Sequence, residues 1–550
     1  TGITDQMRAN IKFRICLRVE TAGESREMLR RADAHYLPSN LPGRGYLQVG
    51  NEEIELVQAA YSGDPYFDPS LPGERPVLWP ERHPEESHVI AQEPAPPKLY
   101  QAVVQMVAEL ADAEGCPPQR APWPEALPAI LALTEPLTST DYLRQTDLIA
   151  LGSVWEQPAV LHPVLAAWLN GRLGWPGVNW RAYAMRPVIG LVDNPYEAQQ
   201  MPLSLNPRRG HAAIYGGSGW GKSVLLRTLI VSLAASHAPS ELHIYVLDLG
   251  GRNLALLERL PHVGAVISPD GDGFEERVAY LLRELFYLVE TRQKALNTAG
   301  VEDVYQYNSW AGSDNSPLPA ILVAIDNFAE FVEAFGETRD NVDSMLDKLI
   351  DLARQSRPYG VHLVVTAKTT GEVPGALFNL LTERLTLRQN DPAEYRAILG
   401  AAPELEEVEG RGAMRDDTYA LAFQAALLVT PDEDATGVNA DLRAIRRLAE
   451  AMAAVPWKGE GPMPIGALPK TVSYPQMEGL ELDDGLPARL RQRMTANWGE
   501  STVPDNADWL SVVLGIVAGN KPRTLRFSAT QDGVHGMIAG GTGSGKSEML

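Results

Sequence analysis

Cysteine and long apolar runs are nearly absent from this sequence. Its 550 residues include two cysteines, Cys16 and Cys116, which excludes a disulfide framework and favours a reducing compartment. The longest near-continuous apolar stretch, around 510–518, is far shorter than the roughly 20 residues that a helix needs to cross a bilayer. The ten histidines show no HExxH spacing, and two cysteines are too few for a structural zinc site. These absences leave a disulfide framework, a membrane-crossing helix and a zinc site without support in the sequence.

Positive charge is also scarce. Lys and Arg number 48 against 70 Asp and Glu, so the formal net charge is −22. The sequence has no cluster of five or more basic residues, and we expect the pair Arg208-Arg209 in a loop near phosphate. This balance argues against binding nucleic acid through bulk charge, although it leaves room for a local basic channel. At roughly 150 residues per domain, the length predicts three or four domains.

Two pairs of segments repeat within the chain. HAAIYGGSGWGKSVLL begins at His211 and HGMIAGGTGSGKSEML at His535, and they share His, Ile, four Gly, Lys, Ser and the last Leu. RICLRVETAGESREML begins at Arg14 and RLTLRQNDPAEYRAIL at Arg384, and they share three Arg, two Leu and a Glu in the same order. The end of one module therefore comes first, then a complete module, then the start of another.

The repeats predict five parts of the chain. These are the end of an upstream module over 1–64, a Pro-rich linker with helices over 65–184, a complete module over 185–430, a linker over 431–504 and the start of a further module over 505–550. The 14 prolines of residues 65–128 are too many for a packed helix or a central strand, yet helical spacing predicts helices over 98–113 and 441–454. The sequence begins without Met and stops inside an unfinished element, so we expect a fragment of a longer chain.

The first glycine-rich loop fits the phosphate-binding pattern GxxxxGK[ST]. It consists of Gly216, Gly217, Ser218, Gly219, Trp220, Gly221, Lys222 and Ser223. Glycines let backbone N–H groups converge on phosphate oxygens, and the following helix adds its N-terminal dipole. We expect Lys222 to neutralise the β- and γ-phosphates and Ser223 to ligate Mg²⁺. An apolar strand over 211–215 and an apolar helix over 223–235 should flank this ATP-binding loop.

The second loop repeats the pattern. It consists of Gly540, Gly541, Thr542, Gly543, Ser544, Gly545, Lys546 and Ser547. We expect a strand before it, with Lys546 in the role of Lys222 and Ser547 as a Mg²⁺ ligand. Two such loops predict two sites for ATP and Mg²⁺.

An acidic strand end completes the first site. The five apolar residues 321–325 precede Asp326, as in a buried parallel strand whose carboxylate holds Mg²⁺. Asn327 follows, where a hydrolytic ATPase of this type usually has Glu to polarise the attacking water. An amide can orient water but cannot accept its proton, and we expect the nearby Glu330 on a helix surface. The central module should therefore bind ATP–Mg²⁺ and hydrolyse it slowly or not at all.

Strands and helices alternate in the central module. Apolar patterns predict strands over 242–247 and 361–366 and a helix over 274–296. The predicted fold is α/β, with mainly parallel sheets flanked by helices and ligands at the carboxyl edge. Lys368 follows the last of these strands, where related ATPases hold a γ-phosphate sensor. An exposed loop lysine explains this residue equally well.

These motifs resemble the FtsK/SpoIIIE ATPases, which are RecA-like, additional-strand P-loop motors. The matching text includes VLDLGGRNLALLERLPHVGAVI from Val246, ILVAIDNFAEF from Ile321 and GVHLVVTAKTT from Gly360. Tandem modules, with PVIGLVDNPYEAQQMPLSL from Pro187, resemble the EccC motors of type VII secretion. In EccC the most active loop comes first, whereas here it follows a module with a degenerate acidic motif. The resemblance implies Lys222, Asp326, Asn327 and Lys546 as catalytic positions.

The resemblance leaves the transported substrate open. One alternative is protein export, with secreted small helical proteins, a membrane secretion complex and further copies of the chain, as a hexamer-type ring or stacked modules, for partners. Such a motor would be cytoplasmic and membrane-associated through parts outside this sequence. The other is a double-stranded DNA translocase, and a third is a non-hydrolysing scaffold. The charge of −22 and the absence of a recognisable winged helix favour export.

Four arginines recur in register and are candidate arginine fingers. They are Arg14 and Arg18 in the first repeat and Arg384 and Arg388 in the second. An arginine from a neighbouring module can stabilise charge during phosphoryl transfer. Packing or salt-bridge roles beside a strand are the alternative.

Overall fold

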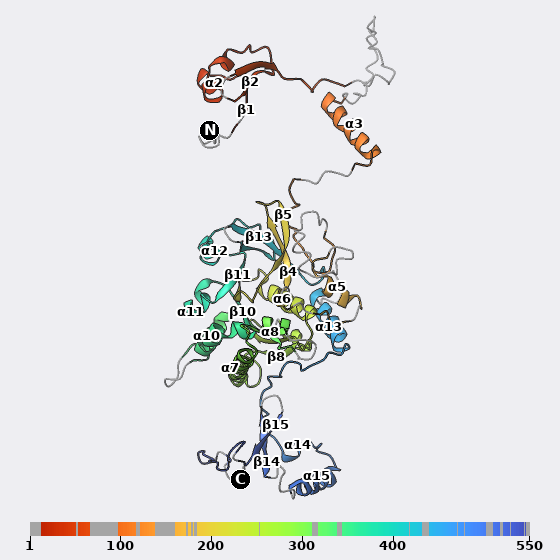
Figure 1. Cartoon of the computed structure of the whole chain (residues 1–550), viewed down its shortest axis with the longest axis vertical. Helices are drawn as coiled ribbons and strands as arrows, with labels where there is room; N and C mark the ends of the chain where they lie inside the picture. The colour runs from red at the N-terminus through yellow and green to blue at the C-terminus, as the bar shows by residue number, and fades with distance from the viewer. Residues whose placement is uncertain are drawn as a thin grey trace, which may run out of the picture. The chain divides into compact units, whose positions relative to one another are not determined.

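We describe the protein from a computed structural model of the chain (Figure 1). The structure describes residues 11, 13–50, 53–66, 97–116, 122–137, 160–171, 174–177, 180, 184–251, 254–310, 317–337, 344–416, 419–431, 439–469, 471–477, 479–501, 510–517, 521–528, 530–543 and 545. The chain divides into two compact units, Thr1–Arg120 and Ala121–Leu550. We treat each unit by itself.

The described residues of the first unit form a small antiparallel sheet, two α-helices and a short 3-10 helix. Its elements are β1 (Phe13–Leu17), α2 (Ala22–Leu29), η1 (Asp33–Tyr36), β2 (Arg44–Val49), β3 (Glu53–Gln58) and α3 (Leu99–Ala113). The strands pair in the order β1-β2-β3, and Cys16, Leu29, Ala34 and Leu37 form the buried core. Helix α3 confirms the helix predicted within the proline-rich segment, but of its described side chains only Ala102 is buried.

A ten-stranded sheet organises the second unit. Its order is β5-β4-β13-β12-β11-β6-β10-β9-β7-β8. Six neighbouring strands, from β11 to β8, are parallel, and β12, β13, β4 and β5 extend the sheet by antiparallel pairing. The strands are β4 (Val188–Asn194), β5 (Gln199–Ser204), β6 (His211–Tyr215), β7 (Leu242–Asp248), β8 (Val263–Ile267), β9 (Ala320–Asp326), β10 (Val361–Ala367), β11 (Leu381–Leu387), β12 (Arg411–Asp416) and β13 (Tyr419–Ala425).

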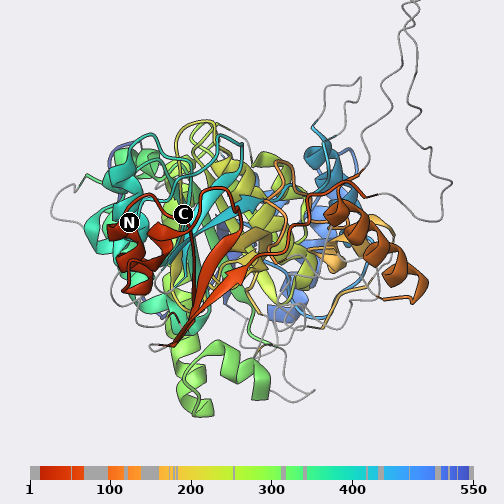
Figure 2. The same cartoon turned by 90° about the horizontal axis from the view of Figure 1, so that it is seen from above.

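Helices cover both faces of this sheet. Alternate residues of β6 point to opposite faces, so Ala212 and Ile214 join one core while Ala213 and Tyr215 join the other. The first core is covered by α5 (Pro163–Leu169), α6 (Lys222–Ser236), η2 (Ala255–Arg259) and α13 (Ala440–Ala453). The second is covered by α7 (Phe274–Ala299), α9 (Phe328–Phe335), α10 (Met345–Ser356), α11 (Gly375–Phe378) and α12 (Pro392–Leu399). Figures 1 and 2 show α10 to α12 and α13 on opposite sides of the strands.

The expected α/β fold is therefore confirmed for the central part of the chain. The predicted strands over 211–215, 242–247, 321–326 and 361–366 correspond to β6, β7, β9 and β10, and the predicted helices to α6, α7 and α13. Three short elements complete this part: α8 (Val304–Trp310), η3 (Arg357–Tyr359) and η4 (Thr370–Glu372). None of the helices in the described part of the chain has the length and apolarity needed to cross a membrane.

The C-terminal segments differ from the sequence prediction in one respect. They contain α14 (Tyr474–Met477), α15 (Leu486–Ser501) and a hairpin of β14 (Ser511–Val517) and β15 (Lys521–Arg526). The strand expected before the second loop is not formed. Residues 535–540 have no regular structure, and Met537 is 92% exposed. A buried parallel strand needs sheet neighbours, and within the described residues β14 and β15 pair only with each other.

Candidate nucleotide site

The first glycine-rich loop connects β6 to α6 at the carboxyl edge of the parallel strands. Strand β6 ends at Tyr215 and α6 begins at Lys222, so the helix N-terminus faces the loop. Gly219 and Gly221 have φ of 84° and 97°, a left-handed conformation that only glycine adopts easily. The N–H of Gly217 donates to the Arg388 carbonyl at 2.8 Å, which ties the loop to the end of β11. The loop is thus a preformed cradle of backbone donors.

Lys222 lies across the mouth of this loop. Its ammonium Nζ donates to the carbonyl oxygens of Gly216 at 2.7 Å and Gly217 at 2.9 Å. Burial lowers the pKa of Lys222, while the negative charges of Asp326 and Glu372 act in the opposite direction. The cationic group is therefore held where it can neutralise phosphate charge.

The predicted metal ligands, Ser223 and Asp326, lie side by side. The Ser223 hydroxyl donates to Asp326 Oδ2 at 2.7 Å, and the Thr366 hydroxyl donates to Asp326 Oδ1 at 2.6 Å. A Cβ atom on Gly250 would lie 2.5 Å from Asp326 Oδ2, so a larger residue there would collide with this buried carboxylate. A carboxylate beside a hydroxyl is an oxygen donor set that fits Mg²⁺, which usually binds one or two carboxylates together with nucleotide phosphates.

Asn327 has a specific backbone role next to this carboxylate. Its φ of 64° and ψ of 68° are left-handed, a conformation that Asn tolerates better than most residues. Its backbone N–H donates to the Thr366 hydroxyl at 2.8 Å, and its side-chain amide donates to the Leu249 carbonyl at 3.4 Å. Glu330 is exposed on α9, as expected, so it contributes no buried base here.

These groups surround a cavity of about 470 Å³. The loop, the first turns of α6 and the ends of β7, β9 and β10 line it. Lys368 also lines it, and its backbone is fixed because its N–H donates to Glu372 and its carbonyl accepts from Gln389 at 3.0 Å. The exposed Lys368 side chain therefore starts from a fixed backbone position beside the cavity, from which it can reach a bound phosphate.

The four recurring arginines have different surroundings. Arg384 donates to the carbonyls of Leu381 and Phe378 and stacks on the Phe378 ring at 3.8 Å, which is a packing role. Arg388 pairs with Glu407 and lies 5.0 Å from the ring of Trp220 in its own loop. In the first unit, Arg14 donates to the Met28 carbonyl at 3.4 Å, and Arg18 is exposed.

The expected position of the basic pair Arg208-Arg209 near phosphate is wrong. Both residues precede β6, so they lie at the opposite end of that strand from the phosphate loop. Together with Arg186 and Arg357 they line a separate cavity of about 510 Å³, where Arg208 stacks over Tyr305 at 4.2 Å. The basic residues that line the candidate phosphate site are instead Lys222, Arg227 and Lys368.

Only part of the second glycine-rich loop belongs to the described residues. Gly540, Gly541, Thr542, Gly543 and Gly545 belong to the described residues, whereas Ser544, Lys546 and Ser547 lie outside them. The second set of predicted ligands therefore stays a prediction.

Two residues of the first site escaped the sequence analysis. Thr366 ends the strand predicted over 361–366, and a hydroxyl at the end of an apolar strand is the signal that points to it. Arg227 lines the cavity from α6 and pairs with Asp441. An arginine within an otherwise apolar helix was the signal, but its partner lies 214 residues away in the chain.

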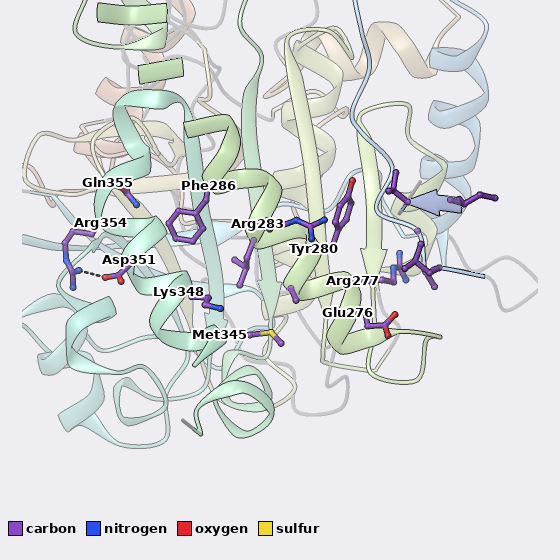
Figure 3. A pocket seen from close by; sticks show the side chains of 17 residues that line it. Glu276, Arg277, Tyr280, Arg283, Phe286, Met345, Lys348, Asp351, Arg354 and Gln355 are labelled. Atoms are coloured by element: carbon purple, nitrogen blue, oxygen red, sulfur yellow. Dashed lines mark hydrogen bonds and ion pairs between the residues drawn. The ribbon is translucent and has the colours of Figure 1, made fainter. Parts of the chain in front are cut away.

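A larger cavity of about 1080 Å³ lies over α7 and α10 (Figure 3). Arg283 and Tyr280 of α7 contact each other, with the guanidinium 4.8 Å from the ring, and Arg354 pairs with Asp351 on α10 at 2.5 Å. Among the described residues that line it, none belongs to a glycine-rich loop and none is a carboxylate at the end of a strand. The groups suited to nucleotide phosphates are thus in the smaller cavity.

Comparison with known proteins identifies the family that this central part resembles. Residues 180–415 match the model of the FtsK/SpoIIIE family. The chain is 29% identical over 476 residues to the ESX-4 secretion system protein EccC4 of Mycobacterium tuberculosis, covering 85% of this chain and 33% of that protein. It is 28% identical over 474 residues to the ESX secretion system protein EccC of Geobacillus thermodenitrificans, covering 86% and 28%.

A solved structure agrees with the fold. The cytoplasmic domain of the Thermomonospora curvata type VII secretion ATPase EccC matches with a TM-score of 0.52 and 24% identity, over 95% of this chain and 50% of that one. The resemblance to FtsK/SpoIIIE P-loop ATPases and to EccC-type proteins is therefore confirmed. The chain spans about a third or less of the length of the curated relatives described above.

Proposed function

We propose that this chain is part of a protein-export motor built from FtsK/SpoIIIE-type modules, whose central module binds ATP with Mg²⁺. The observation that carries the proposal is the contact of Ser223 with Asp326 directly behind the phosphate loop. Lys222 would neutralise the β- and γ-phosphates, and the backbone N–H groups of the loop would bind their oxygens. Ser223 and Asp326 would hold the Mg²⁺, which supplies charge neutralisation when bound.

The central module is proposed to retain ATP rather than turn it over rapidly. Hydrolysis needs a group that accepts a proton from the attacking water, and the amide of Asn327 cannot do so. The Asn327 side chain also donates to the Leu249 carbonyl. Bound ATP would then serve as a structural ligand of the module, while the loop at 540–547 belongs to the module proposed to hydrolyse.

Protein export is favoured over DNA translocation by charge and by relatives. The chain carries a net charge of −22, and two curated relatives are named as ESX secretion system proteins. We propose secreted small helical proteins, a membrane secretion complex and further copies of the chain as partners. The chain would work at the cytoplasmic face, attached through parts outside this sequence.

The central-site proposal is tested by nucleotide binding and turnover in the full chain. Lys222→Ala should weaken ATP binding by about tenfold or more, because it removes a charge-assisted phosphate contact. Lys546→Ala is the matched control at the other loop and should leave binding at the central site intact. Turnover that survives Lys546→Ala but is lost in Lys222→Ala would show that the central module hydrolyses ATP, contrary to the proposal.

The substrate proposal has a separate test. ATP turnover should rise on adding a small helical-hairpin secretion substrate and should not respond to double-stranded DNA. Stimulation by DNA with a steep dependence on salt would instead favour the translocase alternative, because each neutralised phosphate releases a counterion.

A further inference from the structure

The nucleotide cavity extends beyond the phosphate loop to Arg227 on α6. Arg227 lies one helical turn after Ser223 and Val224, on the same face of the helix, and all three residues line the cavity. Only 7% of Arg227 is exposed. A buried arginine on the floor of a phosphate site is a candidate ligand contact that the loop pattern does not predict.

The sheet order shows which end of the cavity Arg227 faces. Strands β10 and β9, with Thr366 and Asp326, follow β6 on one side, and β11, β12 and β13 follow it on the other. Arg227 pairs with Asp441, and Asp441 accepts hydrogen bonds from residues just beyond β13. The Arg227 side chain therefore extends from this shared helix face toward the β13 side of the sheet, away from β9 and Asp326. A nucleotide with its Mg²⁺-bound phosphates toward Asp326 would extend its nucleoside toward Arg227.

The Arg227 guanidinium has a donor left for a ligand. Its Nη2 contacts Asp441 Oδ2 at 3.2 Å. Its Nε is buried and has no hydrogen-bond partner within the described part of the chain. A guanidinium carries five N–H donors in a fixed planar arrangement, so it can hold Asp441 and a ligand acceptor together.

Asp441 joins this guanidinium to the start of α13. Its Oδ1 accepts from the N–H groups of Leu428 at 3.0 Å and Val429 at 3.3 Å, and its own N–H donates to Asn439 Oδ1 at 2.9 Å. Helix α13 is the first helix after the sheet and leads toward the next glycine-rich loop. A change at Arg227 thus acts directly on the first turn of this helix.

We propose that Arg227 contacts the nucleoside end of ATP and, through Asp441, couples nucleotide occupancy to the stability of α13. This inference rests on the proposed ATP-binding function. The guanidinium donates to an acceptor of the nucleoside while it remains paired with Asp441. Binding then removes the unpaired buried donor and reduces the freedom of the Arg227–Asp441 pair, which in turn restrains the start of α13.

The proposed contact of Arg227 with the nucleoside is tested by measuring the affinity for two ligands, Mg²⁺–ATP and Mg²⁺–tripolyphosphate. The full chain carrying Lys546→Ala serves as the parent. Arg227→Gln should weaken ATP binding about tenfold and change tripolyphosphate binding less than about twofold, because only ATP has a nucleoside. The matched charge control is Arg446→Gln, an exposed residue of α13 that should change neither. Equal effects of Arg227→Gln on both ligands, or no effect on ATP, would refute the nucleoside contact.

Failure of the proposed function gives a different result. If the parent chain binds neither ligand, or if Lys222→Ala has no effect on either, the ATP site itself is refuted. Arg227→Gln also leaves the Asp441 carboxylate buried without its partner, which can unfold the module. The double variant Arg227→Gln/Asp441→Asn removes both charges, and Asn keeps an oxygen for the Leu428 and Val429 N–H groups. This folded double variant should reproduce the ATP-specific loss.

The proposed coupling of nucleotide occupancy to the stability of α13 is tested by amide hydrogen exchange. In the parent chain, ATP should slow exchange in α13 by about tenfold, because the helix opens less often when its first turn is restrained. Asp441→Asn should still bind ATP but lose this protection, and Arg446→Gln should keep it. Unchanged ATP-dependent protection in Asp441→Asn would refute the coupling.

Discussion

Residues 13–58 and 381–425 have the same local structure in different surroundings. Leu17 lies opposite Gly45 in the β1–β2 pair, and Leu387 lies opposite Gly412 in the β11–β12 pair. In the next pair of strands, Arg44 donates through Nε to Gln58 at 3.1 Å, as Arg411 does to Gln424 at 2.9 Å. The sequence repeat is therefore a repeat of strand register and side-chain hydrogen bonds.

The surroundings of the two segments differ sharply. Leu387 is fully buried and Leu385 is 1% exposed, whereas their counterparts Leu17 and Ile15 are 50% and 54% exposed. Strand β11 pairs with β6 as well as β12, while β1 pairs only with β2 within the described residues. Local contacts can thus be encoded in a short segment, but burial depends on the neighbouring strands that the rest of the module supplies.

The C-terminal ends of α12 and α2 also share local geometry in different surroundings. The C-terminal capping residue of α12 is Gly400, with φ of 80°, and that of α2 is Arg30, with φ of 60°. In both, the N–H of the capping residue donates to an arginine carbonyl four residues earlier at 2.9 Å. A left-handed arginine costs about 1 kcal/mol relative to glycine. The shared geometry persists at this cost in the more exposed copy.

The largest expected difference between the two regions is their response to acid. A fall in pH should lower the free energy of unfolding of the central core, which contains buried neutral histidines, more than that of residues 13–58. Burial lowers the pKa of His162 and His237 to about 4 and of His262 to about 3. His162 and His237 each accept a backbone N–H, from Leu165 and Met185, so protonation also breaks a hydrogen bond. Each histidine is thus held neutral in the folded core.

The sign of the pH dependence follows from these shifts. Above pH 6.5 the three histidines are neutral in both folded and unfolded chains, so they add no pH dependence. Below it only the unfolded chain takes up protons, so the free energy of unfolding should fall by up to about 4 kcal/mol per pH unit until the folded pKa values are reached. Urea unfolding of the central core from pH 7.5 to 5 measures this. An unchanged midpoint across that range would contradict the prediction, and His535→Gln, at an exposed histidine, is the control.

A matched pair of cavity substitutions should show the next largest difference. Leu387→Ala should lower the free energy of unfolding of the central core by about 3 kcal/mol, because it leaves a cavity in a closed sheet. Leu17→Ala should change the stability of its segment by less than about 0.5 kcal/mol, because the side chain is already half exposed. Urea unfolding and amide exchange of β1 to β3 report the two values. Similar losses at both positions would mean that β1 is covered as β11 is.

The central fold could be predicted because its signals are local. Mainly apolar runs of five or six residues predict β6, β7, β9 and β10, and the loop pattern places Lys222 between a strand and a helix. The strand before the second loop was not correctly predicted, since periodicity does not reveal whether sheet neighbours are present. The basic pair at Arg208 was misplaced for a related reason, because charge spacing does not specify which end of a strand a loop occupies.

The candidate site also contains some residues that local motifs predict and others that only the fold brings together. Ser223 and Asp326 were chosen from motifs, and the structure brings them within 2.7 Å of each other. The contacts of Thr366 with Asp326 and of Arg227 with Asp441 span 40 and 214 residues, and no local pattern specifies such pairs. Sequence motifs thus identify the residues around the phosphates, while the residues that connect the site to the rest of the module require the fold.

Arginines at one repeat position provide the smallest and sharpest test of the comparison. Arg388 lies over Trp220 of the phosphate loop and pairs with Glu407, whereas its counterpart Arg18 is exposed. Arg388→Ala should weaken ATP binding by about two- to fivefold through the lost cation–π contact, and Arg18→Ala should leave it unchanged. Titration calorimetry on the full chain measures both.

Because this contact lies within one module, a loss of ATP turnover without a loss of ATP affinity in Arg388→Ala would instead favour the arginine-finger role. If ATP affinity, turnover and association of modules all stay unchanged, Arg388 acts in neither way, and the recurrence of this arginine reflects only the shared strand-end geometry.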